Sequence, residues 1–307
     1  MLSFLPGPLL FIINSLLIAF NVILIATPIL LLGIVKILLP FDFIKKFVDN
    51  CNYYLYKIWV VDNRMLMSLT NDIRWHITGD EIPSTRKSCI VLSNHISWLD
   101  ILFIGAVYGG RIPITKFFMK QNLIYIPFVG LACYTLGMPF LKRYPKEKLL
   151  KNPALRTKDV ETTKKVCREL VKFPSSLINF CEGTRYTPEK AKKAKSTYRH
   201  LMPPKAASLG VALSEIYDEV EYIFNTTFYY PENSKGAFMD MMFGRIKNVY
   251  VNIEILEKND RLRGNYLEDK TFKHDFTMYL RELWEKKDKI IDEMEADFRG
   301  LSQNKEK

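Results

Sequence analysis

The chain has 307 residues, of which 48% are apolar and 25% are charged, so it can form one large folded domain or two small ones and is not intrinsically disordered. Its charges are unevenly distributed, because residues 1–35 contain no Asp, Glu, Lys or Arg. This distribution excludes a simple soluble enzyme. Since no second stretch of similar length lacks charges, a multi-spanning transporter is also excluded. The sequence predicts a water-facing domain attached to one membrane segment.

The net charge of +11 is compatible with binding to nucleic acid, anionic lipid or an anionic small substrate. The apolar segment favours lipid. No recognition helix and no basic strand with interleaved aromatic residues indicates nucleic acid, so we expect no nucleic-acid partner. The five cysteines show no CxxC spacing, which gives no support for a zinc site and indicates a reducing compartment.

Residues 1–40 are predicted to form an N-terminal membrane anchor. As one helix, residues 8–35 would span roughly 40 Å, more than the ~30 Å hydrocarbon core of a bilayer. Pro28 lies inside this run, so either a tilted, kinked single span or a shallow hairpin would absorb the excess length. A helix buried in the protein core is the alternative to an anchor.

The basic residues Lys36, Lys45 and Lys46 follow the apolar run, and the positive-inside tendency puts this side in the cytoplasm. Residues 41–73 mix aromatic, basic and apolar side chains. They are predicted to form an interfacial helical linker, although an ordinary surface helix would have the same composition.

Beyond residue 73, short apolar runs alternate with helical patterns. Strands are predicted at residues 73–78, 89–93 and 176–181, and helices at residues 98–107 and 158–172. This order predicts an α/β fold with a mostly parallel sheet flanked by helices, whose active site lies beyond the carboxyl ends of the strands. The domain is expected to extend over residues 74–299 and to end in a frayed tail, residues 300–307.

The first loop of interest runs from Asn94 to Asp100, directly after a predicted strand. Ser97 and Asp100 have the spacing of a capping box at the start of a helix, which is a purely structural explanation for both. The same placement lets the Asp100 carboxylate accept a hydrogen bond from the ring of His95. A carboxylate so placed fixes the imidazole tautomer for acid–base catalysis.

The second loop, Phe180–Arg185, also follows a predicted buried strand. Gly183 permits a sharp turn and close approach of a ligand, Arg185 offers a planar fork for phosphate or carboxylate, and Thr184 adds a hydroxyl. Glu182 can anchor that arginine or orient a substrate hydroxyl. A glycine turn with a surface ion pair is the structural alternative.

Two further segments are weaker signals when taken alone. Gly137–Arg143 places the cations Lys142 and Arg143 after a short apolar segment, and Met202–Ala206 is a rigid, weakly polar stretch that can form the wall of a pocket.

Taken in order, the His95-x4-Asp100 pair, the Gly137–Arg143 segment, the Glu182–Arg185 motif and the Pro-Pro stretch resemble the PlsC-like glycerolipid acyltransferase family. The likeness is to its lysophosphatidic acid acyltransferases, also called 1-acyl-sn-glycerol-3-phosphate acyltransferases. It resembles in particular the branch that reads Pro-Phe-x-Lys-Arg, which is found in bacterial inner membranes and is similar to lysocardiolipin acyltransferases. Leu141-Lys142 departs from the commoner Ile-Asp-Arg pattern and leaves the acceptor open.

The resemblance implies the glycerolipid acyltransferase fold and transfer of an acyl chain from a thioester to the sn-2 hydroxyl of lysophosphatidic acid, giving phosphatidic acid. His95 would be the general base and Asp100 would orient it. Arg185 and Arg143, with Lys142 as a third cation, would hold the acceptor phosphate. Glu182 would bind the acceptor or hold Arg185, beside Gly183 and Thr184.

The implied partners are a membrane bilayer, a lysophospholipid acceptor, and acyl-CoA or acyl carrier protein as the acyl donor, with no metal and no cofactor. The implied location is the inner membrane, with the catalytic domain facing the cytoplasm. Two alternatives stay open, namely transfer to another lysophospholipid and a membrane-tethered lipid-binding module without turnover. The module would predict a broken His/Asp pair or a missing arginine, and neither is seen.

The remaining polar residues receive simpler interpretations. His76, His200 and His274 have no partner motif and are expected to be structural or at the surface. The basic run of residues 190–199 is either a solvated face or a contact for anionic headgroups or the polyphosphate of coenzyme A. Trp98 is expected to pack in the core.

Overall fold

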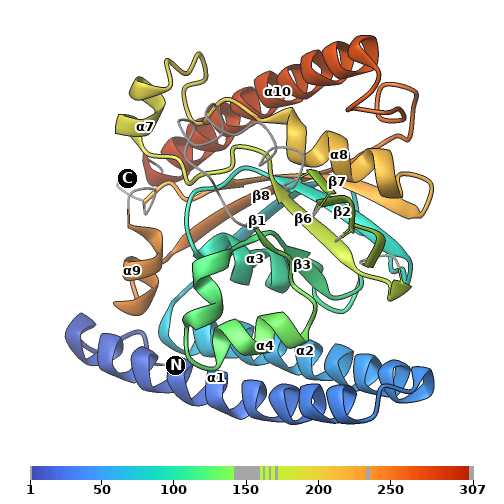
Figure 1. Cartoon of the computed structure of the whole chain (residues 1–307). Coiled ribbons are helices and arrows are strands. Elements are labelled where there is room, and N and C mark those ends of the chain that lie inside the picture. The colour runs from blue at the N-terminus through green and yellow to red at the C-terminus, as the bar shows by residue number, and fades with distance from the viewer. Residues whose placement is uncertain are drawn as a thin grey trace.

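The computed structural model describes residues 2–141, 172–232 and 236–303, together with 160, 161, 163–165 and 167–169. Its centre is a six-stranded sheet with the strand order β1-β8-β7-β2-β6-β3 (Figure 1). The strands are β1 (Arg74–Gly79), β2 (Ser88–Ser93), β3 (Thr115–Phe117), β6 (Ser176–Phe180), β7 (Val220–Tyr229) and β8 (Asn248–Leu256). A separate small sheet pairs β4 (Met119–Lys120) with β5 (Phe140–Leu141).

Helices surround this sheet. They are α1 (Gly7–Leu38), α2 (Asp42–Thr70), α3 (Leu99–Tyr108), the 3₁₀ helix η1 (Gln121–Tyr125), α4 (Val129–Thr135), α7 (Pro188–Lys193), α8 (Ala206–Ile216), α9 (Ala237–Met242) and α10 (Lys270–Gln303). In Figure 1, α8 and α10 cover one side of the sheet, and α3, α4 and the long pair α1 and α2 lie on the other. Helix α10 continues past Gly300, where the sequence predicted a frayed tail to begin.

The sheet is mixed but mostly parallel, as the sequence predicted. Neighbouring strands run parallel in every pairing of the large sheet except β7 with β8, which is antiparallel. Strand β2 lies between β6 and β7, and its last residue, Ser93, is in register with Phe180 and Thr226. Because β2 and β6 are parallel neighbours, the two loops that follow them emerge at the same edge of the sheet.

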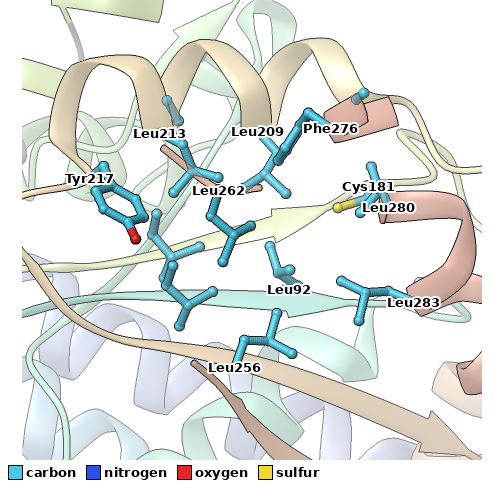
Figure 2. Packing of buried hydrophobic residues seen from close by; sticks show 14 of the residues in the cluster. Leu92, Cys181, Leu209, Leu213, Tyr217, Leu256, Leu262, Phe276, Leu280 and Leu283 are labelled. Atoms are coloured by element: carbon cyan, nitrogen blue, oxygen red, sulfur yellow. The ribbon is translucent and has the colours of Figure 1, made fainter. Parts of the chain in front are cut away.

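Strand β2 is buried on both faces, which explains its uninterrupted apolar run. Ile90 and Leu92 belong to the cluster under α8 and α10, whereas Val91 belongs to the cluster on the α3 side. Figure 2 shows the first cluster, in which leucines of α8 and α10 gather over Leu92. This double-sided core holds rigid the strand that carries the first loop.

Helix α1 is one continuous helix of 32 residues, about 48 Å long, in spite of Pro28. Residues 8–35 therefore do not turn back on themselves as a hairpin. Instead, the whole of α1 lies beside α2 after a short link (Figure 1). It is the one described helix that is long and apolar enough to cross a membrane, and it also packs against α4 and α9.

A buried polar contact holds α1 on the rest of the protein. The Asn14 side chain is 2% exposed, and its Nδ2 donates to Met242 O at 2.9 Å and to Met241 O at 3.3 Å in α9. Its Oδ1 accepts from Thr70 Oγ1, at the end of α2, at 2.9 Å. One asparagine therefore joins α1, α2 and α9.

We expect Asn14→Ala to lower the stability of the folded protein, because Met242 O and the Thr70 hydroxyl would lose buried partners at about 1–3 kcal/mol each. Thermal unfolding in a mild detergent measures the effect as a lower melting temperature. Thr27→Ala is the matched control, since Thr27 bonds only to Ile23 O of its own helix. An Asn14→Ala melting curve that coincides with that of the control would contradict this role.

Candidate active site

The two loops singled out in the sequence meet at the carboxyl ends of β2 and β6. The backbone N–H of His95 in the first loop donates to Glu182 Oε1 in the second at 3.3 Å. The backbone N–H of Tyr186 donates in turn to His95 O at 2.7 Å. The ring of His95 stacks on Phe180, the last residue of β6, with 4.1 Å between ring centroids. The two loops thus form one site.

The Asp100 carboxylate is fully buried and surrounded by donors. Its Oδ2 accepts from His95 Nδ1 at 2.7 Å and from the backbone N–H groups of Ile96 at 2.7 Å and Ser97 at 3.0 Å. Its Oδ1 accepts from the Tyr230 hydroxyl at 2.6 Å. These bonds compensate the cost of removing a carboxylate from water and leave it one orientation.

The loop contains half of the predicted capping box and also the predicted contact between His95 and Asp100. Asp100 reaches back to the N–H of Ser97, as a capping box requires, while the Ser97 hydroxyl accepts from Leu99 N at 3.4 Å rather than from Asp100. The same carboxylate oxygen holds the imidazole. With Nδ1–H directed to Asp100, Nε2 of His95 is the ring nitrogen that can accept a proton.

The far end of β7 supports this loop from the other side of β2. The Asn94 side chain pairs with the backbone of Phe228, accepting from its N–H and donating to its carbonyl, both at 2.9 Å. Tyr230, two residues on, supplies the hydroxyl bond to Asp100. No local pattern in the sequence indicates this support, because it comes from residues more than 125 positions away along the chain.

Glu182 is buried, with 1% of its surface exposed, and it binds backbone rather than Arg185. Its oxygens accept from His95 N and from Met202 N at 3.2 Å, so it connects the first loop to the Pro-Pro stretch. Burial raises the pKa of the Glu182 carboxyl to about 8, against the smaller opposing effect of these backbone bonds. The expectation that Glu182 holds Arg185 is therefore replaced by a bracing role.

Arg185 is exposed and its guanidinium lies over the ring of Trp98, 5.2 Å from the centroid. Thr184 and the carbonyl of Arg185 accept from Lys190 Nζ at 3.2 and 3.0 Å. Gly183 has φ +65°, and an added Cβ would lie 3.3 Å from Lys205 Nζ. The glycine therefore permits both the turn and the approach of a cation that the sequence did not single out.

Arg185 and Lys190 line a polar pocket of about 610 Å³ that also includes Ile96, His200 and Glu295. Two cations in one pocket suit an anionic group. Lys190 reaches this pocket from the basic run, so at least this member of the run is not merely part of a solvated face.

A second, apolar cavity of about 520 Å³ opens beside the same loop. Its lining includes Trp98, Ile101 and Leu102 near the His95 loop, and its walls continue along α1, α2 and α4 through residues such as Ile25 and Ala132. Its few polar groups include the paired hydroxyls of Tyr56 and Thr115, 2.6 Å apart. Such a cavity can take an extended aliphatic chain.

Trp98 is 45% exposed and lines this cavity, so the expectation that it packs in the core is wrong. The reason is its place at the N-cap of α3, where the chain leaves the sheet. Because Ile96 faces the polar pocket and Trp98 the apolar one, the His95 loop separates two cavities of opposite character.

Some predicted residues lie elsewhere. Lys142 and Arg143 lie outside the described residues. His76 bonds to Asn248 Oδ1 at 3.2 Å on β8, and His274 is exposed on α10.

His200, with Asp292 and Glu295, forms a group of potential metal donors among the described residues. Both carboxylates already pair with Arg199, at 2.7 and 2.8 Å, so a cation is present there.

The comparisons with known proteins point to one family. Residues 74–217 match the family model named Acyltransferase. The chain is 24% identical over 219 residues, 66% of its length, to an uncharacterized acyltransferase of Schizosaccharomyces pombe, of which it covers 59%. It is 30% identical over 138 residues, 44% of its length, to a chloroplastic 1-acyl-sn-glycerol-3-phosphate acyltransferase of Brassica napus, of which it covers 33%. The chain thus spans less than two thirds of these relatives.

The crystal structure of the 1-acyl-sn-glycerophosphate (LPA) acyltransferase PlsC from Thermotoga maritima matches with a TM-score of 0.59 at 16% identity. The match covers 94% of this chain and 96% of that one, so the fold is shared over nearly the full length. The family and structure matches together confirm the predicted resemblance to glycerolipid acyltransferases, and the branch within that family stays a prediction.

The raised pKa of Glu182 predicts a pH-dependent contribution to stability. The folded state holds this proton more tightly than the unfolded state, so the stabilisation is complete below about pH 4.5 and is lost as the pH rises toward 8. Glu182→Gln cannot titrate at this position. The melting temperature of the wild type relative to this variant should therefore fall between pH 5 and pH 8.

Glu219→Gln, at an exposed carboxylate, controls for the loss of one negative charge. A difference between wild type and Glu182→Gln that stays constant over this pH range would show that burial does not raise the pKa of Glu182.

Proposed function

We propose that this chain, which carries an Acyltransferase domain over residues 74–217, transfers a fatty acyl group from a thioester to the sn-2 hydroxyl of lysophosphatidic acid and so makes phosphatidic acid. The observation that carries the proposal is the pair His95 Nδ1 and Asp100 Oδ2, 2.7 Å apart, on a loop between an apolar cavity and a polar pocket that contains Arg185 and Lys190. That arrangement suits a substrate with one aliphatic and one anionic end.

The chemistry needs one base and no covalent enzyme intermediate. His95 Nε2 accepts the proton of the acceptor hydroxyl as the hydroxyl oxygen attacks the thioester carbonyl. Asp100 stabilises the imidazolium that forms. When the tetrahedral intermediate collapses, the C–S bond breaks and the leaving thiolate takes the proton from His95. The products are an ester and a free thiol, and the imidazole is neutral again.

The two cavities suggest how the substrates are bound. The apolar cavity would hold an acyl chain along α1 and α4. Arg185 and Lys190 would hold the acceptor phosphate in the polar pocket, and Arg143 and Lys142 remain further candidates for that contact. The donor would be acyl-CoA or acyl carrier protein, and we propose no metal and no cofactor. Since Leu141-Lys142 departs from the common family pattern, another lysophospholipid is the alternative acceptor.

We also propose where the protein works. Side chains on α1, α2 and α4 form an exposed apolar surface, which includes Phe20 at 65%, Phe43 at 70% and Leu131 at 52% exposure. Burying such side chains in lipid is favourable, so this surface would sit in a bilayer next to the mouth of the apolar cavity. We expect this surface to lie on the cytoplasmic side of an inner membrane. The reason is that Lys36, Lys45 and Lys46 lie where α1 ends and α2 begins.

His95→Ala is expected to abolish transfer from oleoyl-CoA to lysophosphatidic acid, with a loss of at least a hundredfold in kcat, because general-base catalysis contributes about 10²–10⁴-fold. The assay follows radiolabelled phosphatidic acid made by purified protein in vesicles. His274→Ala, at an exposed histidine of α10, is the matched control and should retain wild-type activity.

Near-wild-type activity of His95→Ala would show that the base is another group. Product only from a different lysophospholipid in the same assay would favour the alternative acceptor. No product from any acceptor, with acyl-CoA or with acyl carrier protein, would favour a lipid-binding module.

Arg185→Ala should raise the KM for lysophosphatidic acid by roughly ten- to a hundredfold, because a hydrogen bond to a charged group is worth about 1.5–3 kcal/mol. The change in kcat should be smaller. Lys193→Ala, which removes an exposed cation of α7 outside the polar pocket, is the control. Repeating the assay with 1-acylglycerol, which lacks the phosphate, tests whether Arg185 acts on the phosphate or on another part of the acceptor. An equal loss with both acceptors would contradict a phosphate contact.

A further inference from the structure

Lys287 is a completely buried cation in the middle of α10, with 0% of its surface exposed. Helix α10 lies outside the residues that match the Acyltransferase family model, which end at residue 217. Its neighbour Lys286 is exposed and pairs with Glu254. Lys287 instead turns inward, toward β7.

The amine of Lys287 binds β7 where that strand passes the candidate active site. Nζ donates to Thr226 O at 2.6 Å and to Thr227 Oγ1 at 3.0 Å. Thr226 is in register with Ser93, the last residue of β2. Lys287 therefore contacts β7 opposite Ser93, and Ser93 precedes His95 by two residues.

The residues that follow along β7 hold the catalytic loop directly. Phe228 pairs with the Asn94 side chain, and Tyr230 donates to Asp100. We call residues 226–230 the β7 end. Lys287 binds the β7 end on one side. On the other side, the β7 end binds Asn94 and Asp100, the first and last residues of the His95 loop.

The charges of Lys287 and Glu182, the buried carboxyl that accepts from His95 N, also interact electrostatically. Burial lowers the pKa of Lys287 to about 7, against the opposing effects of Cys181, Glu182 and Glu254. A buried amine costs free energy, and an apolar side chain of similar volume often serves stability as well or better. Stability alone therefore does not account for a lysine at this position.

We propose that Lys287 is a positioning residue that fixes the β7 end and thereby sets the geometry of the His95–Asp100 pair. It acts through Thr226 and Thr227 and touches no substrate. The proposal relies on the proposed function only for its kinetic measurement.

The first test measures kinetics of the full-length protein in vesicles. Lys287→Met keeps the volume and removes the amine, and should lower kcat at least tenfold with little change in the KM for lysophosphatidic acid or the acyl donor. Lys289→Met, at an exposed lysine of the same helix, is the matched control and should behave as wild type. An unchanged kcat per folded molecule would overturn the proposal.

A milder pair of variants covers the case in which Lys287→Met does not fold. Thr227→Val removes one acceptor of the Lys287 amine without changing shape and should lower kcat severalfold, whereas Thr227→Ser keeps the hydroxyl and should restore it. Where Lys287→Met does fold, the Thr227→Val effect should disappear in the double variant. Equal activity of the Val and Ser variants, or full additivity in the double variant, would overturn the proposal.

The second test needs no substrate, so it separates this proposal from the proposed function. Hydrogen–deuterium exchange followed by mass spectrometry reports on residues 95–97, whose amides donate to Glu182 and Asp100. Lys287→Met should speed exchange there by at least fivefold and leave α7 unchanged. Faster exchange in Lys287→Met than in wild type, together with a wild type that transfers no acyl group, would support the positioning role and refute the proposed function. Faster exchange confined to α10 would indicate a merely structural lysine.

Discussion

The site is organised around a carboxylate that has been taken out of water. Asp100 has no exposed surface, and a buried charge is tolerated only when donors surround it. Those donors come from the His95 ring, two backbone amides of the same loop and the hydroxyl of Tyr230. Satisfying this one anion therefore fixes the loop, the start of α3 and the end of β7 relative to one another. A second buried carboxyl, Glu182, braces the same loop from β6.

The helices place the loop that contains His95 and Asp100 between an apolar cavity and a polar pocket. Helices α8 and α10 cover one face of the sheet with an apolar core, shown in Figure 2. Among the described residues, none from these two helices lines the apolar cavity. The opposite face is covered by α1, α2, α3 and α4, whose packing leaves that cavity. The polar pocket lies beyond the other side of the His95 loop, next to α7. This boundary suits a substrate that has one aliphatic and one charged end.

Local sequence signals predicted the parts of the structure that are local. The apolar run at β2, the His95–Asp100 spacing and the glycine turn at Gly183 each need only a few neighbouring residues. The long-range features were not predictable in this way, because β1 pairs with β8 across more than 170 residues and Tyr230 meets Asp100 across 130. Glu182 was expected to bind the acceptor or to hold Arg185 nearby, yet the partners that the structure gives it are backbone amides of two other segments. Trp98 was misjudged since nothing local reveals a cavity formed by α1.

Helix α1 has two roles that cannot be separated. Its outer side presents Leu16 and Phe20 to the surroundings, while its inner side supplies Val22, Ile25 and Ile29 to the apolar cavity. Deleting the helix to obtain a water-soluble catalytic domain would thus open that cavity along its length and release the Asn14 contact that joins α2 and α9. The proposed attachment to lipid and the proposed binding of an aliphatic chain would therefore depend on the same stretch of polypeptide, and neither could change in evolution without affecting the other.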